Sequence, residues 1–212
     1  MKTDIKLILI PLLALTIGAV ALIYFNKKSL DPTPVKTETS ILHREGNYKK
    51  GSSTAKVTVV EFFDPECEGC AAFHPLLKKI AGEYPNDVQI VARYMLFHGN
   101  SHPAALALEG AGKQGKFWEM YNFMLERQNE WSHQKDPVNL VFEKFAKELG
   151  LNIEEFNKAY DDITFQAALA KDMADGQALG VKGTPTFFIN GKKLGNLSYN
   201  DLKGAIDEEL KK

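Results

Sequence analysis

The stretch that decides the fold is "EFFDPECEGCAAFHP", residues 61–75, which holds both cysteines of the chain, Cys67 and Cys70. The residues that lead into it, "KVTVVEFF" at 56–63, are β-branched and aromatic, as is typical of a buried strand. The residues that follow, 71–84, place apolar side chains at the spacing of a helix. The two cysteines therefore lie where a predicted strand passes into a predicted helix.

The rest of the chain supplies further strands and a long run of helical patterns. "DVQIVARYM", residues 87–95, predicts a second strand, and helical periodicity runs from about residue 100 to about residue 180. "TPTFFIN", residues 184–190, predicts a strand that turns at Asn190-Gly191 into the short strand "KKLGN". We expect side-chain caps at Asn152 and Ser198. The fold class is then α/β, with a mixed central sheet and a helical insertion.

The first residues differ from the rest. Residues 7–25, "LILIPLLALTIGAVALIYF", carry no charge and are long enough to span a bilayer as a helix. A cleaved signal peptide is the alternative, because Ala19-Val20-Ala21 has the small-residue form of a cleavage site. We expect an anchor or signal at 1–28, a linker at 29–40 and one domain at 41–212. The domain would lie outside the cytoplasm, on a single-pass anchor in the cell membrane or secreted after cleavage.

Composition excludes several classes of protein. The chain has 212 residues, of which 44% are hydrophobic and 25% charged, and its formal net charge is −1. The sequence lacks the basic stripe that would predict binding to nucleic acid. We expect no cofactor and no resident metal.

Three roles are open to the cysteine pair. As a structural disulfide, Cys67–Cys70 would close a very short loop and stabilise the domain little. As a metal site, the pair would need further ligands, and His98 and His102 have the spacing of two ligands on one helix turn. As a redox pair, Cys67 would lie at a helix N-terminus, where the helix dipole favours a thiolate. Cys70, one turn further on, could then resolve a mixed disulfide.

The chain resembles the DsbA family of extracytoplasmic thiol–disulfide oxidoreductases, which have the thioredoxin fold. The matching features are "VVEFFDPECEGC", the proline five positions after the second cysteine, the helical insertion and "GTPTFFINGK", within residues 41–212. The resemblance implies that Cys67 is the nucleophile and Cys70 the resolving thiol. It also implies that Pro185 is a cis proline beside the pair, that Thr184 supports the substrate backbone and that Glu61 assists proton transfer.

The sequence departs from the best-known family pattern between the cysteines, where Glu68-Gly69 replaces Pro-His. Gly69 cannot stabilise a thiolate as a histidine does. Asp64, Glu66 and Glu68 are expected to surround Cys67 with negative charge, which disfavours its thiolate. Our hypothesis is that the protein is a weaker oxidant than its Pro-His relatives.

The favoured function is therefore a thiol–disulfide oxidoreductase that forms or exchanges disulfides in secreted proteins. Its partners would be extracytoplasmic proteins with thiols, and a membrane protein that reoxidises the pair. One alternative is a disulfide reductase or isomerase kept reduced by a membrane donor. Another is a copper- or zinc-binding module.

Overall fold

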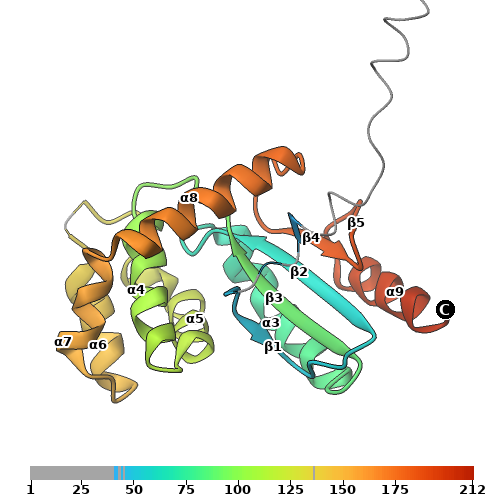
Figure 1. The fold of residues 1–212 in the computed structure, drawn as a ribbon, viewed down its shortest axis with the longest axis horizontal. Coiled ribbons are helices and arrows are strands. Elements are labelled where there is room, and N and C mark those ends of the chain that lie inside the picture. The colour runs from blue at the N-terminus through green and yellow to red at the C-terminus, as the bar shows by residue number, and fades with distance from the viewer. Residues whose placement is uncertain (1–40, 43, 45, 136) are drawn as a thin grey trace, which may run out of the picture. The chain divides into compact units, whose positions relative to one another are not determined.

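The computed structural model describes residues 41–212, apart from residues 43, 45 and 136 (Figure 1). The expected anchor or signal at 1–28 and the linker at 29–40 lie outside the described residues. Within the described part of the chain, every helix is too short or too polar to cross a bilayer.

The centre of the domain is a five-stranded mixed sheet in the order β1-β3-β2-β4-β5. The central strand, β2, runs parallel to β3 and antiparallel to β4. Both outer strands are short and antiparallel to their neighbours. The mixed sheet expected from the sequence is thus confirmed. The strands are β1 (Lys49–Lys50), β2 (Val57–Phe63), β3 (Val88–Tyr94), β4 (Thr186–Ile189) and β5 (Lys192–Lys193).

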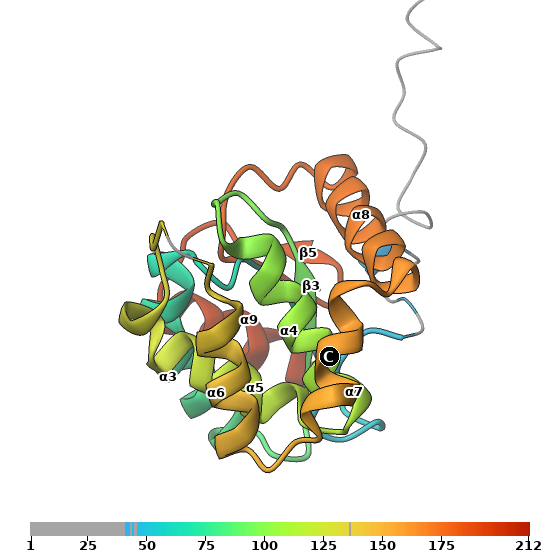
Figure 2. The same ribbon diagram turned by 90° about the vertical axis from the view of Figure 1, so that its left-hand side faces the viewer.

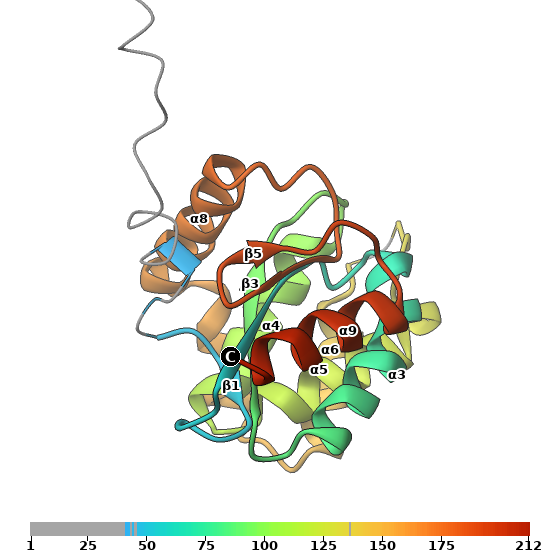
Figure 3. The ribbon, with the colours of Figure 1, turned by 90° about the vertical axis from the view of Figure 1, so that its right-hand side faces the viewer.

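Helices cover both faces of this sheet. α3 and α9 pack side by side on one face (Figure 3), and α8 lies on the other. α4 to α7 form a helical block beside the sheet, between β3 and α8 in the chain (Figure 2). The bounds are α3 (Glu68–Glu83), α4 (Ser101–Lys113), α5 (Phe117–Glu126), α6 (Asn139–Glu148), α7 (Ile153–Asn157), α8 (Ile163–Ala178) and α9 (Tyr199–Leu210), with 3₁₀ turns η1 (Gln128–Glu130) and η2 (Lys158–Tyr160).

The side chains of β2 alternate between the two faces, as those of any strand do. Val57 and Val59 join the apolar cluster under α3 and α9. Val60 and Phe62 join the cluster under α8. Glu61 lies on the same face of β2 as Val57 and Val59. Its carboxyl group is therefore buried next to the apolar cluster under α3 and α9.

A buried ion network fixes α8 to β3. Arg93 is fully buried and contacts Asp172 at 2.9 Å and Asp175 at 2.7 Å through separate guanidinium nitrogens. The same guanidinium donates to the carbonyl of Ile41 at 2.6 Å, and Arg44 also pairs with Asp172. Because every charge has a partner, α8 is held over the sheet by polar as well as apolar contacts.

Candidate active site

Cys67 occupies the N-cap position of α3, directly after the loop that leaves β2. Its φ of −73° and ψ of 122° are extended, so the chain turns into the helix after this residue. The thiol is partly exposed and lies 3.2 Å from the carbonyl oxygen of Thr184, which accepts its hydrogen bond. The sulfur therefore sits at the positive end of the α3 dipole.

The surroundings of Cys67 favour its thiolate. Its pKa is lowered from 9.0 to about 5, chiefly by a hydrogen bond from the Cys70 thiol. Partial burial opposes this shift, and the backbone N–H groups of Cys70 and Gly69 lower the pKa further. A large fraction of Cys67 is thus the nucleophilic thiolate at neutral pH.

Cys70 has the opposite character. It is completely buried in the core cluster that joins the sheet to the helical block. Burial raises its pKa well above 9.0, and the neighbouring Cys67 and Glu61 raise it further. Both cysteines are free thiols in this structure. The pair therefore consists of one accessible thiolate and one shielded thiol, one helical turn apart.

Glu61 is buried on the side of the pair where Cys70 lies. Only 1% of its surface is exposed, and burial raises its pKa from 4.5 to about 7. The hydroxyl of Tyr121, from α5, donates to Glu61 Oε2 at 2.7 Å and partly offsets that shift. A carboxyl with this pKa can both hold and release a proton near neutral pH.

Thr184 and Pro185 lie on the other side of Cys67, just before β4. The peptide bond between them is cis. A Cβ placed on Gly69 would lie 3.4 Å from Pro185 Cδ, 3.4 Å from the Thr184 carbonyl oxygen and 3.5 Å from Cys67 Sγ. The structure thus brings Thr184 and Pro185 against Cys67, although more than a hundred residues separate them in the chain.

The acidic residues before Cys67 do not act as the sequence suggested. Asp64 is fully buried, and one carboxylate oxygen accepts hydrogen bonds from the backbone of Phe97 at 2.6 Å and from His98 Nδ1 at 2.8 Å. The other oxygen accepts from the Ser101 hydroxyl. Asp64 therefore anchors the loop before α4, and both of its carboxylate oxygens accept hydrogen bonds.

Glu66 is a second internal anchor. It is 1% exposed and accepts hydrogen bonds from the backbone N–H groups of Asn100 and His133. Only Glu68 is exposed, and it pairs with His133 Nε2 at 2.6 Å. The pKa of Cys67 falls, and none of these three acids is among the groups that shift it, so the expected effect of the acids on the thiolate is not borne out.

The two histidines considered as metal ligands have separate partners. His98 pairs with Asp64, and His102 Nε2 lies 2.7 Å from the side-chain oxygen of Gln166. Among the described residues, no three His, Cys, Asp or Glu side chains gather in a way that could hold a metal ion. The metal-binding alternative is therefore not favoured.

Sequence reasoning missed residues that the helical block contributes. Gln128 donates hydrogen bonds to the carbonyls of Pro65 at 2.8 Å and Cys67 at 3.1 Å. Tyr121 reaches Glu61 from the same block. Nothing in the periodicity of these segments distinguishes the two residues from ordinary core or surface positions.

Known proteins resemble the chain over most of this domain. The model of a thioredoxin family matches residues 44–208. Probable disulfide bond formation protein D of Bacillus anthracis is 33% identical over 172 residues, which is 76% of this chain and 77% of that protein. The Na(+)/H(+) antiporter NhaA 1 of Salinispora arenicola is 33% identical over 164 residues. The match covers 76% of this chain but only 24% of the antiporter, so the chain spans about a quarter of such a relative.

A solved structure shows the same fold. Oxidised BdbD from Bacillus subtilis superposes with a TM-score of 0.73 at 30% identity, over 79% of this chain and 95% of that one. The family match, the relative that aligns over most of both chains and the shared fold agree with the site geometry. The chain belongs to the thioredoxin family and is related to probable disulfide bond formation protein D.

Proposed function

We propose that this chain forms or exchanges disulfides in proteins outside the cytoplasm, with Cys67 and Cys70 as its redox pair. One observation carries the proposal: the pKa of Cys67 is lowered to about 5, while that of Cys70, one turn away, is raised well above 9.0. Because the two pKa values differ so much, Cys67 is a good nucleophile and leaving group, whereas Cys70 remains a shielded thiol.

The chemistry follows from this division. A substrate thiolate attacks Cys67 Sγ of the oxidised pair, the Cys67–Cys70 bond breaks, and Cys70 leaves and takes up a proton. A second substrate thiolate then attacks the substrate sulfur of the mixed disulfide, and Cys67 leaves as a stable thiolate. Two electrons pass from the substrate to the pair. Glu61 is the proposed source of the proton for Cys70, because its own pKa is about 7.

Thr184 and Pro185 are proposed to support the substrate chain. They adjoin Cys67, and a hollow beside them is lined by Pro185, Phe187 and residues 193–197. Leu197 in this segment is 50% exposed and lines the same hollow as Pro185, so an apolar side chain is available there. An extended peptide that enters here would place a cysteine close to Cys67.

The direction of electron flow is proposed to be oxidation of the substrate. The names of the relatives, disulfide bond formation protein D, support this direction. A membrane partner would then reoxidise the reduced pair. The uncharged run at residues 7–25 would keep the domain close to such a partner, either as an anchor or during export.

The proposal is tested by mixing the purified, oxidised protein with a reduced dithiol peptide and following disulfide formation. The wild type should oxidise the peptide stoichiometrically. Cys70→Ser has no disulfide of its own, so it is mixed in the reduced state with the symmetric disulfide of a single-cysteine peptide. Its Cys67 thiolate should attack that disulfide, release one peptide as a thiolate and stay joined to the other, because the resolving thiol is gone.

Cys67→Ser is the matched control, since it keeps the buried Cys70 and should trap nothing. A trapped peptide attached to Cys70, or no reaction of the wild type with the peptide, would contradict the proposal. Alkylation of free thiols in intact cells then gives the direction: an oxidant should hold the pair mainly as a disulfide.

A further inference from the structure

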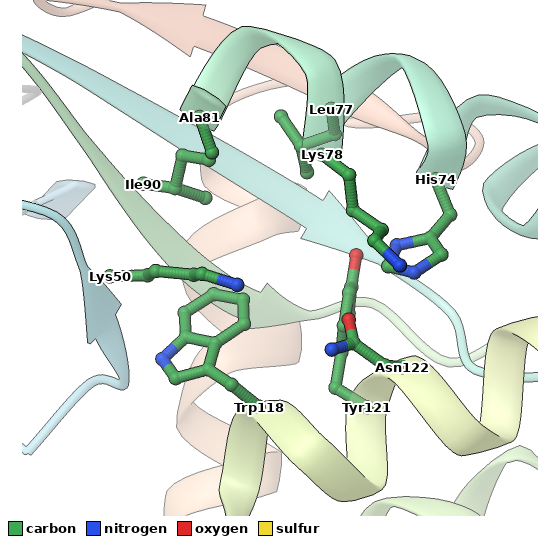
Figure 4. Close-up of a pocket in the computed structure, with 9 residues that line it drawn as sticks. All are labelled: Lys50, His74, Leu77, Lys78, Ala81, Ile90, Trp118, Tyr121 and Asn122. Atoms are coloured by element: carbon green, nitrogen blue, oxygen red, sulfur yellow. The ribbon is translucent and has the colours of Figure 1, made fainter. Parts of the chain in front are cut away.

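A small hollow opens between β1, α3 and α5, on the Tyr121 side of the buried Glu61. Figure 4 shows Tyr121 rising from α5 with its hydroxyl near the ring of His74 from α3, while Lys50 and Trp118 lie at the other end. The volume of the hollow is about 20 Å³. This room suffices for a water molecule but not for a larger ligand.

His74 is the side chain in this hollow that most needs such a water. It is 3% exposed, and neither ring nitrogen has a hydrogen-bond partner among the described residues. The nearest carboxylate, Glu126, is 3.6 Å away. Burial lowers the pKa of His74 to about 4, so its ring is neutral and can both donate and accept. A buried imidazole without partners is costly unless water reaches it.

Tyr121 connects the hollow to the redox pair. Its ring lines the hollow and meets the His74 ring edge-on, with centroids 5.3 Å apart. Its hydroxyl donates to Glu61 Oε2 at 2.7 Å. The charge of Glu61 in turn acts on Cys70. Tyr121 thus lines the hollow and bonds to Glu61, and Glu61 lies close enough to Cys70 to act on it electrostatically, so these residues lead from the hollow toward the buried thiol.

Charged groups surround the outer end of the hollow. Lys78 of α3 pairs with Glu126 of α5 at 2.7 Å, and Lys50 of β1 lies 5.7 Å from the centre of the Trp118 ring. The opening of the hollow is thus flanked by charged groups, while Leu77, Ala81 and Ile90 supply apolar lining.

We propose that this hollow is the proton inlet of the redox pair, and that Tyr121 is the positioning residue that relays protons between its water and Glu61. This inference rests on the proposed function, because it concerns the proton that Cys70 needs when it leaves the disulfide.

The relay balances as follows. When the Cys67–Cys70 bond breaks, the Cys70 thiolate takes the proton of the Glu61 carboxyl group. The Glu61 carboxylate takes the hydroxyl proton of Tyr121, which at the same time takes a proton from the water beside His74. Burial and the charge of Glu61 raise the pKa of Tyr121 well above its ordinary value, so a free tyrosinate does not form and the two transfers are concerted. The water then regains a proton from bulk solvent, so the net change is one proton from solvent to Cys70.

The test is the rate at which the oxidised protein is reduced by a dithiol peptide, measured by stopped flow from pH 5 to 9. Tyr121→Phe should slow the reaction about tenfold or more and alter its pH profile. His74→Phe keeps the hydrogen bond between Tyr121 and Glu61 but removes the imidazole that would bind the water. It should therefore also slow the reaction. In the background Glu61→Gln, neither substitution should slow the reaction further. Small weak acids in the buffer should partly restore the rate of both single variants.

Tyr160→Phe is the matched control, because this hydroxyl in the helical block has no hydrogen-bond partner and should leave the rate unchanged. Wild-type rates and pH profiles in both Tyr121→Phe and His74→Phe would overturn the relay while leaving the proposed function intact. The relay would also be overturned if Tyr121→Phe or His74→Phe slowed the Glu61→Gln variant by the same factor as it slows the wild type. A wild type that fails to oxidise the peptide would instead refute the proposed function.

Discussion

In the proposed redox reaction, Cys67 governs the energetics, because its thiolate stabilises the reduced protein but does not exist in the disulfide. Its pKa falls from 9.0 to about 5 on folding. A group with a lowered pKa contributes stability above its unfolded pKa and loses it as the pH falls through its folded pKa. The reduced form is therefore stabilised at neutral pH and loses this advantage toward pH 5.

The first prediction concerns the reactivity of the two thiols. In the reduced protein, iodoacetamide should modify Cys67 with a rate that is half-maximal near pH 5. Cys70, in the same sample, should remain unmodified across that range because it is fully buried. Mass spectrometry of the digested protein distinguishes the two sites. Half-maximal modification of Cys67 near pH 9, or earlier modification of Cys70, would contradict this assignment.

The second prediction concerns Glu61. Its pKa is raised from 4.5 to about 7, so the folded protein holds a proton here that the unfolded chain releases. The stability from this group is complete below pH 4.5 and is lost as the pH rises through about 7. Glu61→Gln should remove this dependence, worth up to about 3 kcal/mol.

Urea unfolding of the wild type and Glu61→Gln at several pH values measures this effect. Taking the difference between the two proteins cancels the contribution of Cys67, which has the opposite sign. A difference that does not change between pH 4.5 and 8 would show that Glu61 ionises as an ordinary exposed acid.

Single residues could be predicted from the sequence where the chemistry is local. Cys67 and Cys70 are the only cysteines, and Thr184-Pro185 stands at a strand entrance, so the structure places all of these where the motifs suggested. Tyr121 could not be predicted, because it meets Glu61 across 60 positions of sequence.

At the scale of elements, a buried polar network links α8 to β3. Arg93 is completely buried, and its loss would leave Asp172 and Asp175 charged and unpaired in the interior. Removing one partner of a buried ion pair is far more damaging than replacing the whole pair.

The third prediction is that Arg93→Met lowers the free energy of unfolding by about 3–5 kcal/mol. The partly exposed Arg127, which pairs with Glu130 and Glu148, provides a control. Arg127→Met should cost no more than about 1 kcal/mol, because surface ion pairs contribute little. Equal losses in the two variants, measured by chemical unfolding, would show that the Arg93 network is not a special link.

Periodicity predicted the elements well because local sequence determines them. β2 and β3 lie within the segments expected, and the caps at Asn152 and Ser198 are confirmed by hydrogen bonds to Glu155 and Asp201. β5 is shorter than expected, with only its two lysines paired to β4. The burial of Asp64 and Glu66 could not be foreseen, because their partners come from distant loops of the helical block.

At the scale of the whole domain, the sheet positions the redox pair and the helical block tunes it. β2 carries Glu61 and leads into α3, and β4 brings Thr184 and Pro185 to the same place. The block adds Gln128 beneath the loop and Tyr121 beside Glu61. Thiolate stabilisation by such surroundings determines how strongly a disulfide oxidises its substrates.

The pKa of Cys67 places the protein between two known oxidoreductases. Thioredoxin combines a thiol pKa of about 7 with a potential of about −270 mV, and DsbA combines about 3.5 with about −120 mV. A value of about 5 for Cys67 predicts an intermediate potential. The hypothesis of a weaker oxidant than the Pro-His relatives therefore remains a prediction, now with Gly69 rather than the nearby acids as its cause.

The redox equilibrium of the purified domain with glutathione tests the central claim most directly. After acid quenching and alkylation, mass spectrometry gives the fraction of protein in which Cys67 and Cys70 are joined. We predict a reversible two-electron transition with a midpoint between about −270 and about −120 mV. A midpoint outside this interval, or no reversible bond between the two sulfurs, would contradict the account.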